Sequence, residues 1–599
     1  LQTPSQLHDA ILTMDKFSNS LPVAIASIGS SKITLLVGSA ITVGADATIP
    51  DNIILWFVGP GKLFVNSGKV LTINSPSQVL AHTQQQVFDG TGTVSFTNGG
   101  IVSPGWWGFS SGGTAAANAD AYNACTASLT ATGGAIVIPP TGAAHQVDDT
   151  LTHPAKPMSV IGAHPELSII ESTATASLKH GLTFTRSHHV RNLTIKTSAS
   201  LASNYDMYGV RMDLDGVTVS GGNQAVKWES VKVRGFNNSF YCDGGDAYNV
   251  DRLYFNDLDA QCSGPASTYI GSCLYINRVT QVYGTHSQFD QNSTGEHAIY
   301  CFGSKNLVFD GFKIRNFDKG TAQAIKVVGN GVAPDDDQAY PTWSIRNMDI
   351  ADGLNGILCG IYGTETLEAL TVENCKFVDV DTSAAILGCV YLSAAGTSNI
   401  RTLRVSGIST RNCLYQGVHV ATGASATMGP VSIRDCKGYN WSTTSAGTYT
   451  WFGTSGTGTF GPITLEGIEA DGNSKGRTIL SGSGQASTIS RIRYSGLKEV
   501  NTTNMGRPIS LPEADATPSL AIGNWFVQPN TGAQNITAYD NLEANQTYYI
   551  RFSTANTTLI DGANLQLAGS TNYNPPANTF MTFYCSDGTA LYEVSRSVN

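Results

Sequence analysis

Apolar and polar positions alternate along most of the chain, and the alternation breaks at regular intervals. In the segment LTVENCKFVDV (370–380), Glu373 and Asn374 interrupt a β-like alternation that resumes at Cys375. A comparable break follows an apolar anchor residue eleven times: Ile195, Trp228, Phe255, Val282, Phe309, Ile345, Val372, Val405, Ile433, Leu465 and Tyr494. Successive anchors lie 27 to 36 residues apart, which indicates an internal structural repeat.

The residue two positions after each anchor has a distinctive chemistry. Nine of these eleven residues are Gly, Asn or Asp, the types that best tolerate a left-handed backbone; the full set is Thr197, Ser230, Asp257, Gly284, Gly311, Asn347, Asn374, Gly407, Asp435, Gly467 and Gly496. We therefore predict a sharp corner between two strands, with Asn374 in the turn and Glu373 facing solvent. Stacked units of this kind bury their apolar sides together, which predicts an all-β parallel β-helix. A β-propeller would need ~40–50 residues per blade and antiparallel hairpins, whose signals are missing.

The segments outside the repeat differ from it in pattern, and four domains are expected. Residues 1–105 form a β-rich lead-in, residues 106–134 a linker and capping helix, residues 135–504 the parallel β-helix, and residues 505–599 a C-terminal β module. The helix is expected in the Ala-rich stretch Thr114–Thr130.

The two ends of this organisation carry their own signals. Tyr122, Cys125 and Leu129 fall on one face of the expected helix, and Gly133 and Gly134 end it. The C-terminal segment alternates in an antiparallel manner, with Asp-Gly as a hairpin turn. It is therefore expected to form a separate antiparallel module.

Composition narrows the function classes. The chain has 599 residues, 63 of them glycine, and a net charge of −10. Because nucleic acids are bound through Lys and Arg clusters, and no basic run is present, a nucleic-acid partner is not expected. No apolar stretch reaches the ~20 residues of a membrane span, so no membrane insertion is expected either. The eleven cysteines include no CxxC pair, and we expect them buried and reduced.

The order of the segments resembles that of a known family. QQQVFDGTGTVSF (84–96) precedes VSPGWWGF (102–109), a short Ala-rich helix leads to GGAIVIPPTG (133–142), and a terminal β module closes on ALYEVSRSVN (590–599). This arrangement resembles the tailspike depolymerases of tailed bacteriophages, which are built on the pectate-lyase-type right-handed parallel β-helix solenoid. GWWGF departs from the more usual acidic-Trp-Phe-Gly form, and the helix lacks the usual leading Asp-Asp pair.

The resemblance carries expectations about assembly and role. It implies an intertwined homotrimer, with the C-terminal module in trimerisation, located in the virion tail. It also implies binding and cleavage of a bacterial surface polysaccharide, either O-antigen or capsule. Because the sequence starts at Leu1, a preceding N-terminal region that attaches to the phage baseplate or tail is expected to be missing. The resemblance supplies no catalytic residues.

Candidate chemistry lies on the strands that follow the long corners. If Val210, Phe240 and Leu274 point inward, equivalent outward positions stack ~4.8 Å apart between coils. The first outward row is then Arg211, Tyr241, Tyr275, Tyr300 and Lys326. The second begins with Asp213, Asp243 and Asn277. Aromatic, basic and acidic side chains are thus expected on one face.

Such a face suits sugar chemistry. Tyrosines offer a flat apolar ring and a hydroxyl, and two neighbouring carboxylates oppose each other's ionisation, so that one can serve as acid and the other as base or nucleophile. We expect catalytic roles for Asp213, Asp243, Asp246 and Glu296. Substrate-binding roles are expected for Arg211, Tyr241, Tyr275, Asn277, Tyr300, Lys326 and His286. Adjacent coils would give the ~5 Å spacing of retaining glycosidases, and a coil further apart the ~6.5–9.5 Å spacing of inverting ones.

Three function classes stay open. The first is an endoglycosidase, which is favoured narrowly. The second is a polysaccharide lyase that cleaves at a uronic acid by β-elimination, with a Tyr, His or Lys base. The third is a non-catalytic glycan-binding adhesin. No cofactor is expected, and no metal site either, although Asp335, Asp336 and Asp337 form an acidic loop that could hold Ca²⁺.

Overall fold

The computed structural model describes residues 10–597 apart from short internal stretches. These stretches are 130–132, 175–179, 199–206, 215–223, 246–248, 263–270, 292–296, 318–322, 331–338, 382–387, 414–415, 442–450, 473–479, 482–491, 496–497, 501–508 and 521–523. The chain divides into two compact units, Leu1–Lys326 and Val327–Asn599.

The first hundred residues already form a parallel solenoid. Three sheets run side by side in the coils: β1 (Ala10–Thr13), β2 (Ile33–Val37), β5 (Ile53–Phe57) and β8 (Val79–Leu80); β3 (Ala40–Val43), β6 (Lys62–Val65) and β9 (Phe88–Asp89); and β4 (Ala47–Ile49), β7 (Val70–Ile73) and β10 (Thr93–Phe96). Paired strands are 20 to 25 residues apart, which is shorter than the repeat found by sequence. The predicted β-rich lead-in is therefore a set of smaller coils, with a helix between β1 and β2 that was not predicted, α1 (Leu21–Ile28).

The predicted capping helix is present as α2 (Ala115–Ala127). Thr114 caps it, accepting a hydrogen bond from the Ala117 amide at 3.3 Å. Tyr122, Cys125 and Leu129 are fully buried, as the helical spacing predicted. The helix is tied to the next coil because Asn118 Nδ2 donates to the Gln146 carbonyl at 2.9 Å.

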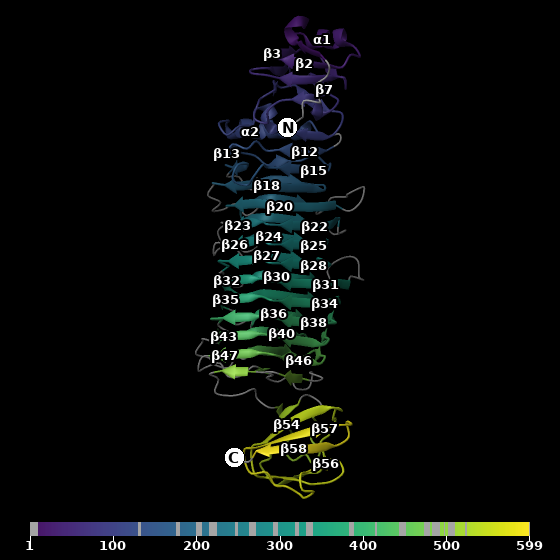
Figure 1. Ribbon diagram of the computed structural model, residues 1–599, viewed down its shortest axis with the longest axis vertical. Coiled ribbons are helices and arrows are strands. Elements are labelled where there is room, and N and C mark those ends of the chain that lie inside the picture. The colour runs from purple at the N-terminus through teal and green to yellow at the C-terminus, as the bar shows by residue number, and fades with distance from the viewer. Residues whose placement is uncertain are drawn as a thin grey trace. The chain divides into compact units, whose positions relative to one another are not determined.

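The rest of the first unit is a parallel β-helix (Figure 1). One sheet contains β11 (Gly100–Val102), β12 (Gly134–Val137), β13 (Ala144–Val147), β15 (Met158–Ile161), β16 (Ile169–Ser172), β18 (His188–Thr197), β20 (Gln224–Arg234), β22 (Val250–Asn256), β23 (Asp259–Gln261), β25 (Val279–Thr285), β26 (Gln288–Asp290), β28 (Asn306–Asp310) and β29 (Lys313–Arg315). A second contains β14 (Leu151–Thr152), β17 (Leu182–Phe184), β19 (Tyr208–Asp213), β21 (Asn238–Asp243), β24 (Ser272–Asn277) and β27 (His297–Phe302). Parallel crossovers of this kind are right-handed, so the unit is a right-handed parallel β-helix.

The predicted corner row is confirmed, with two corrections of register. Trp228 pairs with Val190 instead of Ile195, and Val282 pairs with Leu253, so the anchors of those two coils are Val190 and Gly284. The corrected corner residues within the described part of the chain all have positive φ: Asn192, Ser230, Asp257, His286, Gly311, Asn347, Asn374, Gly407, Asp435 and Gly467. Gly496, the last predicted corner residue, lies outside the described residues. The sequence pattern failed at Gly284 because a glycine replaces the apolar anchor there. A Cβ at Gly284 would lie 2.1 Å from Cζ of Phe255, so the Phe255 ring occupies the space of the missing side chain.

The second unit repeats this construction. One sheet contains the strands on both sides of the corners: β31 (Ala339–Arg346), β32 (Asp349–Leu354), β34 (Thr366–Glu373), β35 (Lys376–Asp381), β37 (Asn399–Ile400), β38 (Leu403–Ser406), β39 (Ser409–Arg411), β41 (Thr427–Met428), β42 (Val431–Arg434), β43 (Lys437–Trp441), β45 (Thr459–Phe460), β46 (Ile463–Glu466), β47 (Glu469–Gly472), β49 (Ile492–Ser495) and β50 (Lys498–Val500). The other sheet contains β33 (Ile357–Tyr362), β36 (Gly388–Ala394), β40 (Gln416–Thr422), β44 (Phe452–Gly456) and β48 (Leu480–Ser481). The predicted register of Ile345, Val372, Val405, Ile433 and Leu465 holds throughout.

The C-terminal module differs in part from the antiparallel prediction. Its main sheet is mixed: β54 (Gln546–Phe552), β57 (Thr579–Cys585) and β58 (Leu591–Ser597) are antiparallel, whereas β51 (Ile509–Ser510), β52 (Trp525–Gln528) and β56 (Leu565–Gln566) join in parallel. Two further strands, β53 (Gln534–Ile536) and β55 (Thr557–Leu559), pair with each other. The Asp-Gly turn is present between β57 and β58, with Gly588 at φ +85°.

Two sequence expectations concern the whole chain. All eleven cysteines are buried, as predicted. Among the described residues, the search for a helix long and apolar enough to cross a membrane found none.

Candidate functional site

The two predicted outward rows are brought together on the sheet of β19, β21, β24 and β27. Arg211, Tyr241, Tyr275 and Tyr300 occupy matched positions on these four successive strands. Asp213, Asp243 and Asn277 occupy matched positions two residues further along. The inward positions of the same strands are fully buried in the core. We call this surface the tyrosine–carboxylate face.

Asp213 and Asp243 lie next to each other on adjacent strands, but their surroundings differ. Asp213 forms an ion pair with Arg211 and keeps 21% of its side chain exposed. Asp243 is only 5% exposed and accepts three hydrogen bonds, from Tyr241 Oη (3.1 Å), Asn277 Nδ2 (2.9 Å) and the Gly245 amide (2.8 Å). The Asp213 carboxylate is therefore partly exposed beside a cation, whereas the Asp243 carboxylate is fixed by three hydrogen bonds.

The pKa of Asp243 is raised, mainly because burial penalises its charged form. The negative charge of Asp213 raises it further, against the opposing effect of the hydrogen bonds that Asp243 accepts. A raised carboxyl pKa beside a second carboxylate is the arrangement that lets one group carry a proton while the other does not.

The tyrosines form a continuous ladder of rings. The rings of Tyr241 and Tyr275 stack with centroids 4.9 Å apart and planes 6° from parallel. Tyr300 meets Tyr275 edge-on at 5.4 Å, and Lys326, on β30 (Gln323–Asn330), places its ammonium 5.0 Å above the Tyr300 ring. Burial raises the pKa of Tyr241 and Tyr275 well above its ordinary value, and the Asp243 charge adds to this effect. These hydroxyls therefore stay protonated and act as hydrogen-bond donors or acceptors.

Three further residues that sequence reasoning missed belong to this face. Tyr208 packs against Tyr241 at 4.7 Å between ring centroids, and the Arg211 guanidinium lies 5.4 Å from its ring. His180 Nε2 lies 3.0 Å from Arg211 Nη1, and His297 Nε2 lies 3.5 Å from Lys326 Nζ. Tyr208 and His297 are in phase with the inward residues Val210 and Ile299, so the alternation along the strands gave no signal for their place on this face.

His180 is neutral in this setting. Burial, with the neighbouring Arg211 charge, lowers its pKa to about 4. Its Nε2 therefore accepts the hydrogen bond from Arg211. Within the part of the chain that the structure describes, the buried atoms His180 Nδ1, Arg211 Nε and Asn277 Oδ1 have no hydrogen-bond partner. Buried polar atoms are normally satisfied, so these three atoms are exceptions among the described residues.

One predicted residue lies away from this face, and two others lie outside the described residues. His286 lies at the corner between β25 and β26, where its φ is +46°, and its position in the corner row replaces the one that the sequence register gave to Gly284. It is therefore not on the strands of the tyrosine–carboxylate face. Asp246 and Glu296 lie outside the described residues. The acidic loop Asp335–Asp337 lies outside them as well. Among the residues that are described, no group of three or more His, Cys, Asp or Glu gathers as a metal site would require.

No protein-family model matches the chain, and no curated protein sequence does either. Several solved structures are similar in fold. They include the catalytic unit of an alpha-1,3-glucanase from Streptomyces thermodiastaticus (11% identity, TM-score 0.34, 68% of this chain and 69% of that one) and the A-module of a mannuronan C-5 epimerase from Azotobacter vinelandii (13%, 0.31, 67% and 97%). A tailspike protein of an Acinetobacter phage is a third (12%, 0.29, 83% and 79%). At TM-scores below 0.5, these similarities do not identify a substrate or a reaction for this chain.

Proposed function

We propose that this protein is a phage tailspike that binds bacterial surface polysaccharide and cleaves it as an endo-acting glycoside hydrolase at the tyrosine–carboxylate face. The observation that carries the proposal is the matched pair Asp213 and Asp243 on adjacent strands, beside the stacked rings of Tyr241 and Tyr275. The pair supplies an acid and a base, and the rings supply flat surfaces for pyranose rings.

The proposed roles follow from the surroundings of each group. Asp243, whose pKa is raised, donates a proton to the leaving oxygen of the glycosidic bond. Asp213, which forms an ion pair with Arg211, attacks the anomeric carbon or stabilises its positive charge. Matched positions on adjacent strands are ~4.8 Å apart, a separation that favours the retaining mechanism. Asp246 and Glu296 stay candidate partners in these roles.

The remaining polar groups bind and orient the sugar. Asn277 Nδ2 and Tyr241 Oη fix the Asp243 carboxyl by hydrogen bonds. Arg211, Tyr300 and Lys326 border the same face and would contact hydroxyl or acidic groups of the glycan. Asn277 Oδ1, Arg211 Nε and His180 Nδ1, which are buried without a described partner, are suited to bind ordered water that bridges to sugar hydroxyls.

A lyase is the second candidate, and one observation supports it. β-Elimination needs a base and a cation that neutralises the sugar carboxylate. Arg211 supplies the cation, and the neutral His180, whose Nε2 accepts from Arg211 at 3.0 Å, supplies the base once that hydrogen bond is released. The tyrosines are poorly suited to act as the base, because their raised pKa disfavours the tyrosinate form. This difference favours hydrolysis at the carboxylates over elimination by tyrosine.

The test is incubation of the protein with purified surface polysaccharides from a panel of bacteria. Fragment size and ultraviolet absorbance are followed together, since elimination creates an absorbing unsaturated sugar end and hydrolysis does not. Shortening without a rise in absorbance supports the hydrolase. Shortening with a rise supports the lyase, and binding without shortening supports an adhesin.

The assembly is part of the same proposal. The homotrimer and the attachment to the phage tail are supported by the order of the motifs along the sequence and by the separate C-terminal module. Light scattering coupled to size-exclusion chromatography tests the trimer, since the chain has a mass of 63.2 kDa. A mass close to that of one chain would contradict it.

A further inference from the structure

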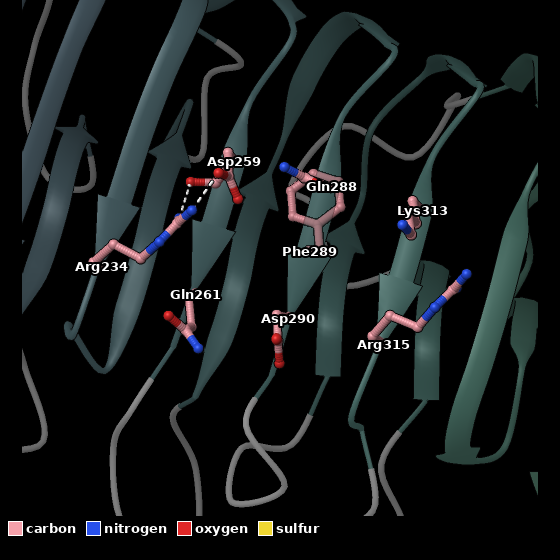
Figure 2. A pocket seen from close by; sticks show the side chains of 8 residues that line it. All are labelled: Arg234, Asp259, Gln261, Gln288, Phe289, Asp290, Lys313 and Arg315. Carbon is pink, nitrogen blue, oxygen red and sulfur yellow. Dashed lines mark hydrogen bonds and ion pairs between the residues drawn. The ribbon is translucent and has the colours of Figure 1, made fainter. Parts of the chain in front are cut away.

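A second hollow lies on other strands of the first unit. It has a volume of about 260 Å³ and is open to solvent. Figure 2 shows it on β20, β23, β26 and β29, where Arg234, Gln261, Asp290 and Arg315 form one row and Asp259, Gln288 and Lys313 another. These strands belong to the sheet that does not contain the tyrosine–carboxylate face. We call this site the arginine hollow.

The carboxylates of the arginine hollow are engaged by neighbours. Arg234 forms an ion pair with Asp259 and also donates to the Asp259 carbonyl at 2.6 Å. Asp290 Oδ1 accepts a hydrogen bond from Asn316 Nδ2 at 3.0 Å. Against these two carboxylates stand three cations, Arg234, Arg315 and Lys313. Lys313 is exposed, and it shares the short strand β29 with Arg315.

This local balance is opposite in sign to the net charge of the chain. The chain carries a net charge of −10, yet the hollow has an excess of positive charge. Two of the three cations, Lys313 and Arg315, share the short strand β29 at one end of the hollow. An anion would therefore be attracted to the β29 end of the hollow.

We propose that the arginine hollow binds an acidic sugar, with its carboxylate at Lys313 and Arg315 and its hydroxyls at the amides of Gln261 and Gln288. Ammonium and guanidinium groups form charge-assisted hydrogen bonds with a carboxylate, and side-chain amides both donate to and accept from sugar hydroxyls. The volume is just below the ~300 Å³ at which pockets for drug-sized ligands begin, so the hollow accommodates about one sugar unit of a longer chain. The inference rests on the proposed function only in taking a saccharide as the ligand, and it assigns to that saccharide an acidic unit.

The test measures binding, not cleavage. Wild type and the double variant Lys313→Ala/Arg315→Ala are titrated by calorimetry with hexagalacturonate and, as the neutral probe, maltohexaose. Lys376→Ala/Arg411→Ala, on β35 and β39 of the second unit, is the matched control because it removes the same two charge types outside the hollow. All four residues lie on strands with exposed or partly exposed side chains at these positions, and thermal melting verifies that each variant folds.

The proposal predicts that wild type prefers hexagalacturonate to maltohexaose. The hollow variant should weaken hexagalacturonate binding by about 10-fold or more, since charge-assisted hydrogen bonds are lost, and added salt should reduce the difference. The control variant should bind as wild type does. Unchanged binding in the hollow variant overturns the proposal, as does a loss of binding in Lys326→Ala alone, which would place the acidic sugar at the tyrosine–carboxylate face. A change in oligomeric state of the hollow variant also overturns it, because the hollow would then be a subunit contact.

The acidic-sugar inference and the proposed hydrolase function can be contradicted independently of each other. If no variant affects hexagalacturonate binding, or wild type binds neither probe, the acidic-sugar inference is wrong, while cleavage of surface polysaccharides still decides the proposed function. If no polysaccharide is shortened but the hollow variant loses hexagalacturonate binding, the hollow is a glycan-binding site on a non-catalytic protein.

Discussion

Each unit carries an aromatic row on its strands, and the two rows differ in what stands beside them. In the first unit, Tyr241 and Tyr275 stack, and Asp213, Asp243 and Asn277 lie two residues further along. In the second unit, Tyr391 and His419 stack at 5.3 Å with parallel planes, and the corresponding neighbours are Ser393, Ala421 and Ser455. Ring stacking thus arises from the solenoid register itself, whereas carboxylates accompany it in the first unit.

The polar atoms of the two rows are also satisfied differently. His419 is engaged on both ring nitrogens, by Gln416 Oε1 at 2.5 Å and Ser455 Oγ at 2.7 Å. In the first unit, His180 Nδ1 and Asn277 Oδ1 are buried with no partner among the described residues. A satisfied aromatic row stabilises the stack. A row whose polar atoms lack described partners, and which lies beside carboxylates, is better suited to bind a ligand.

The largest expected difference between the two rows is in turnover. Asp213→Asn and Asp243→Asn should each lower the rate of polysaccharide cleavage by ~10²-fold or more, because a positioned acid or base contributes that much. Ser393→Ala, in the row of the second unit, should leave the rate unchanged. The rate is measured from reducing ends, with thermal melting as the control for folding. Equal rates for wild type and both Asp variants would place the reaction elsewhere.

Acid should weaken the first unit before the second. Burial lowers the pKa of His153 to about 4 and of His188 to about 3, and His180 has a pKa of about 4, all from an ordinary value of 6.5. The second unit has one described histidine of this kind, His419, with a pKa of about 4. Because the unfolded chain binds these protons first, stability falls as pH drops from about 6.5 to about 4, by on the order of 3 kcal/mol for each histidine.

Hydrogen exchange with mass spectrometry at neutral pH and near pH 5 measures this difference. Strands β15 to β20 should lose more protection than β40 to β44. The neutral form of His188 is fixed by geometry, since its Nε2 accepts from Trp228 Nε1 at 2.9 Å. Equal loss of protection in both units, or a gain in the first, would contradict the account.

Packing in the first unit should be sensitive at one glycine. Gly284→Ala should destabilise the fold by about 1–3 kcal/mol, because the added Cβ would lie 2.1 Å from the Phe255 ring. Gly112→Ala is the matched control, as nothing lies within 4 Å of its Cβ position. Urea unfolding measures both. A Gly284→Ala variant as stable as wild type would mean that the corrected register is wrong.

The corner row of the second unit should show the smallest effect. Asn374 has φ +53° and is exposed, so Asn374→Ala should cost about 1 kcal/mol from left-handed strain. Asn374→Gly should cost less, since glycine adopts this conformation freely. Thermal melting compares the two variants, and a more stable Ala variant would contradict a left-handed corner.

Short-range alternation predicted the parts of the molecule that repeat. The two outward rows were predicted correctly because each strand is short and begins after a corner, so that Val210, Phe240 and Leu274 fix which side chains face inward. The helix was predicted because its apolar face and its stop lie within one segment. At Ile195 and Val282 the same reasoning gave the wrong anchor, because each is an apolar residue near the true anchor, five positions after Val190 and two before Gly284.

The sequence pattern did not predict the contacts that one coil makes with the next. The lead-in coils of 20 to 25 residues were missed because their strands alternate without a common corner residue. His180 joins Arg211 from 31 residues away, and its position on the preceding coil has no local signal. The parallel strands of the C-terminal sheet were missed for a similar reason, since hairpin signals report only the antiparallel pairs.

The most direct test of the central claim is mass spectrometry of the fragments formed in heavy-oxygen water by wild type and by Asp213→Asn. The polysaccharide is one that wild type shortens. The account predicts one heavy oxygen at each new reducing end for wild type, and almost no fragments from the variant over the same time. Unlabelled fragments with unsaturated ends, or labelled fragments formed equally fast by Asp213→Asn, would contradict hydrolysis at the tyrosine–carboxylate face.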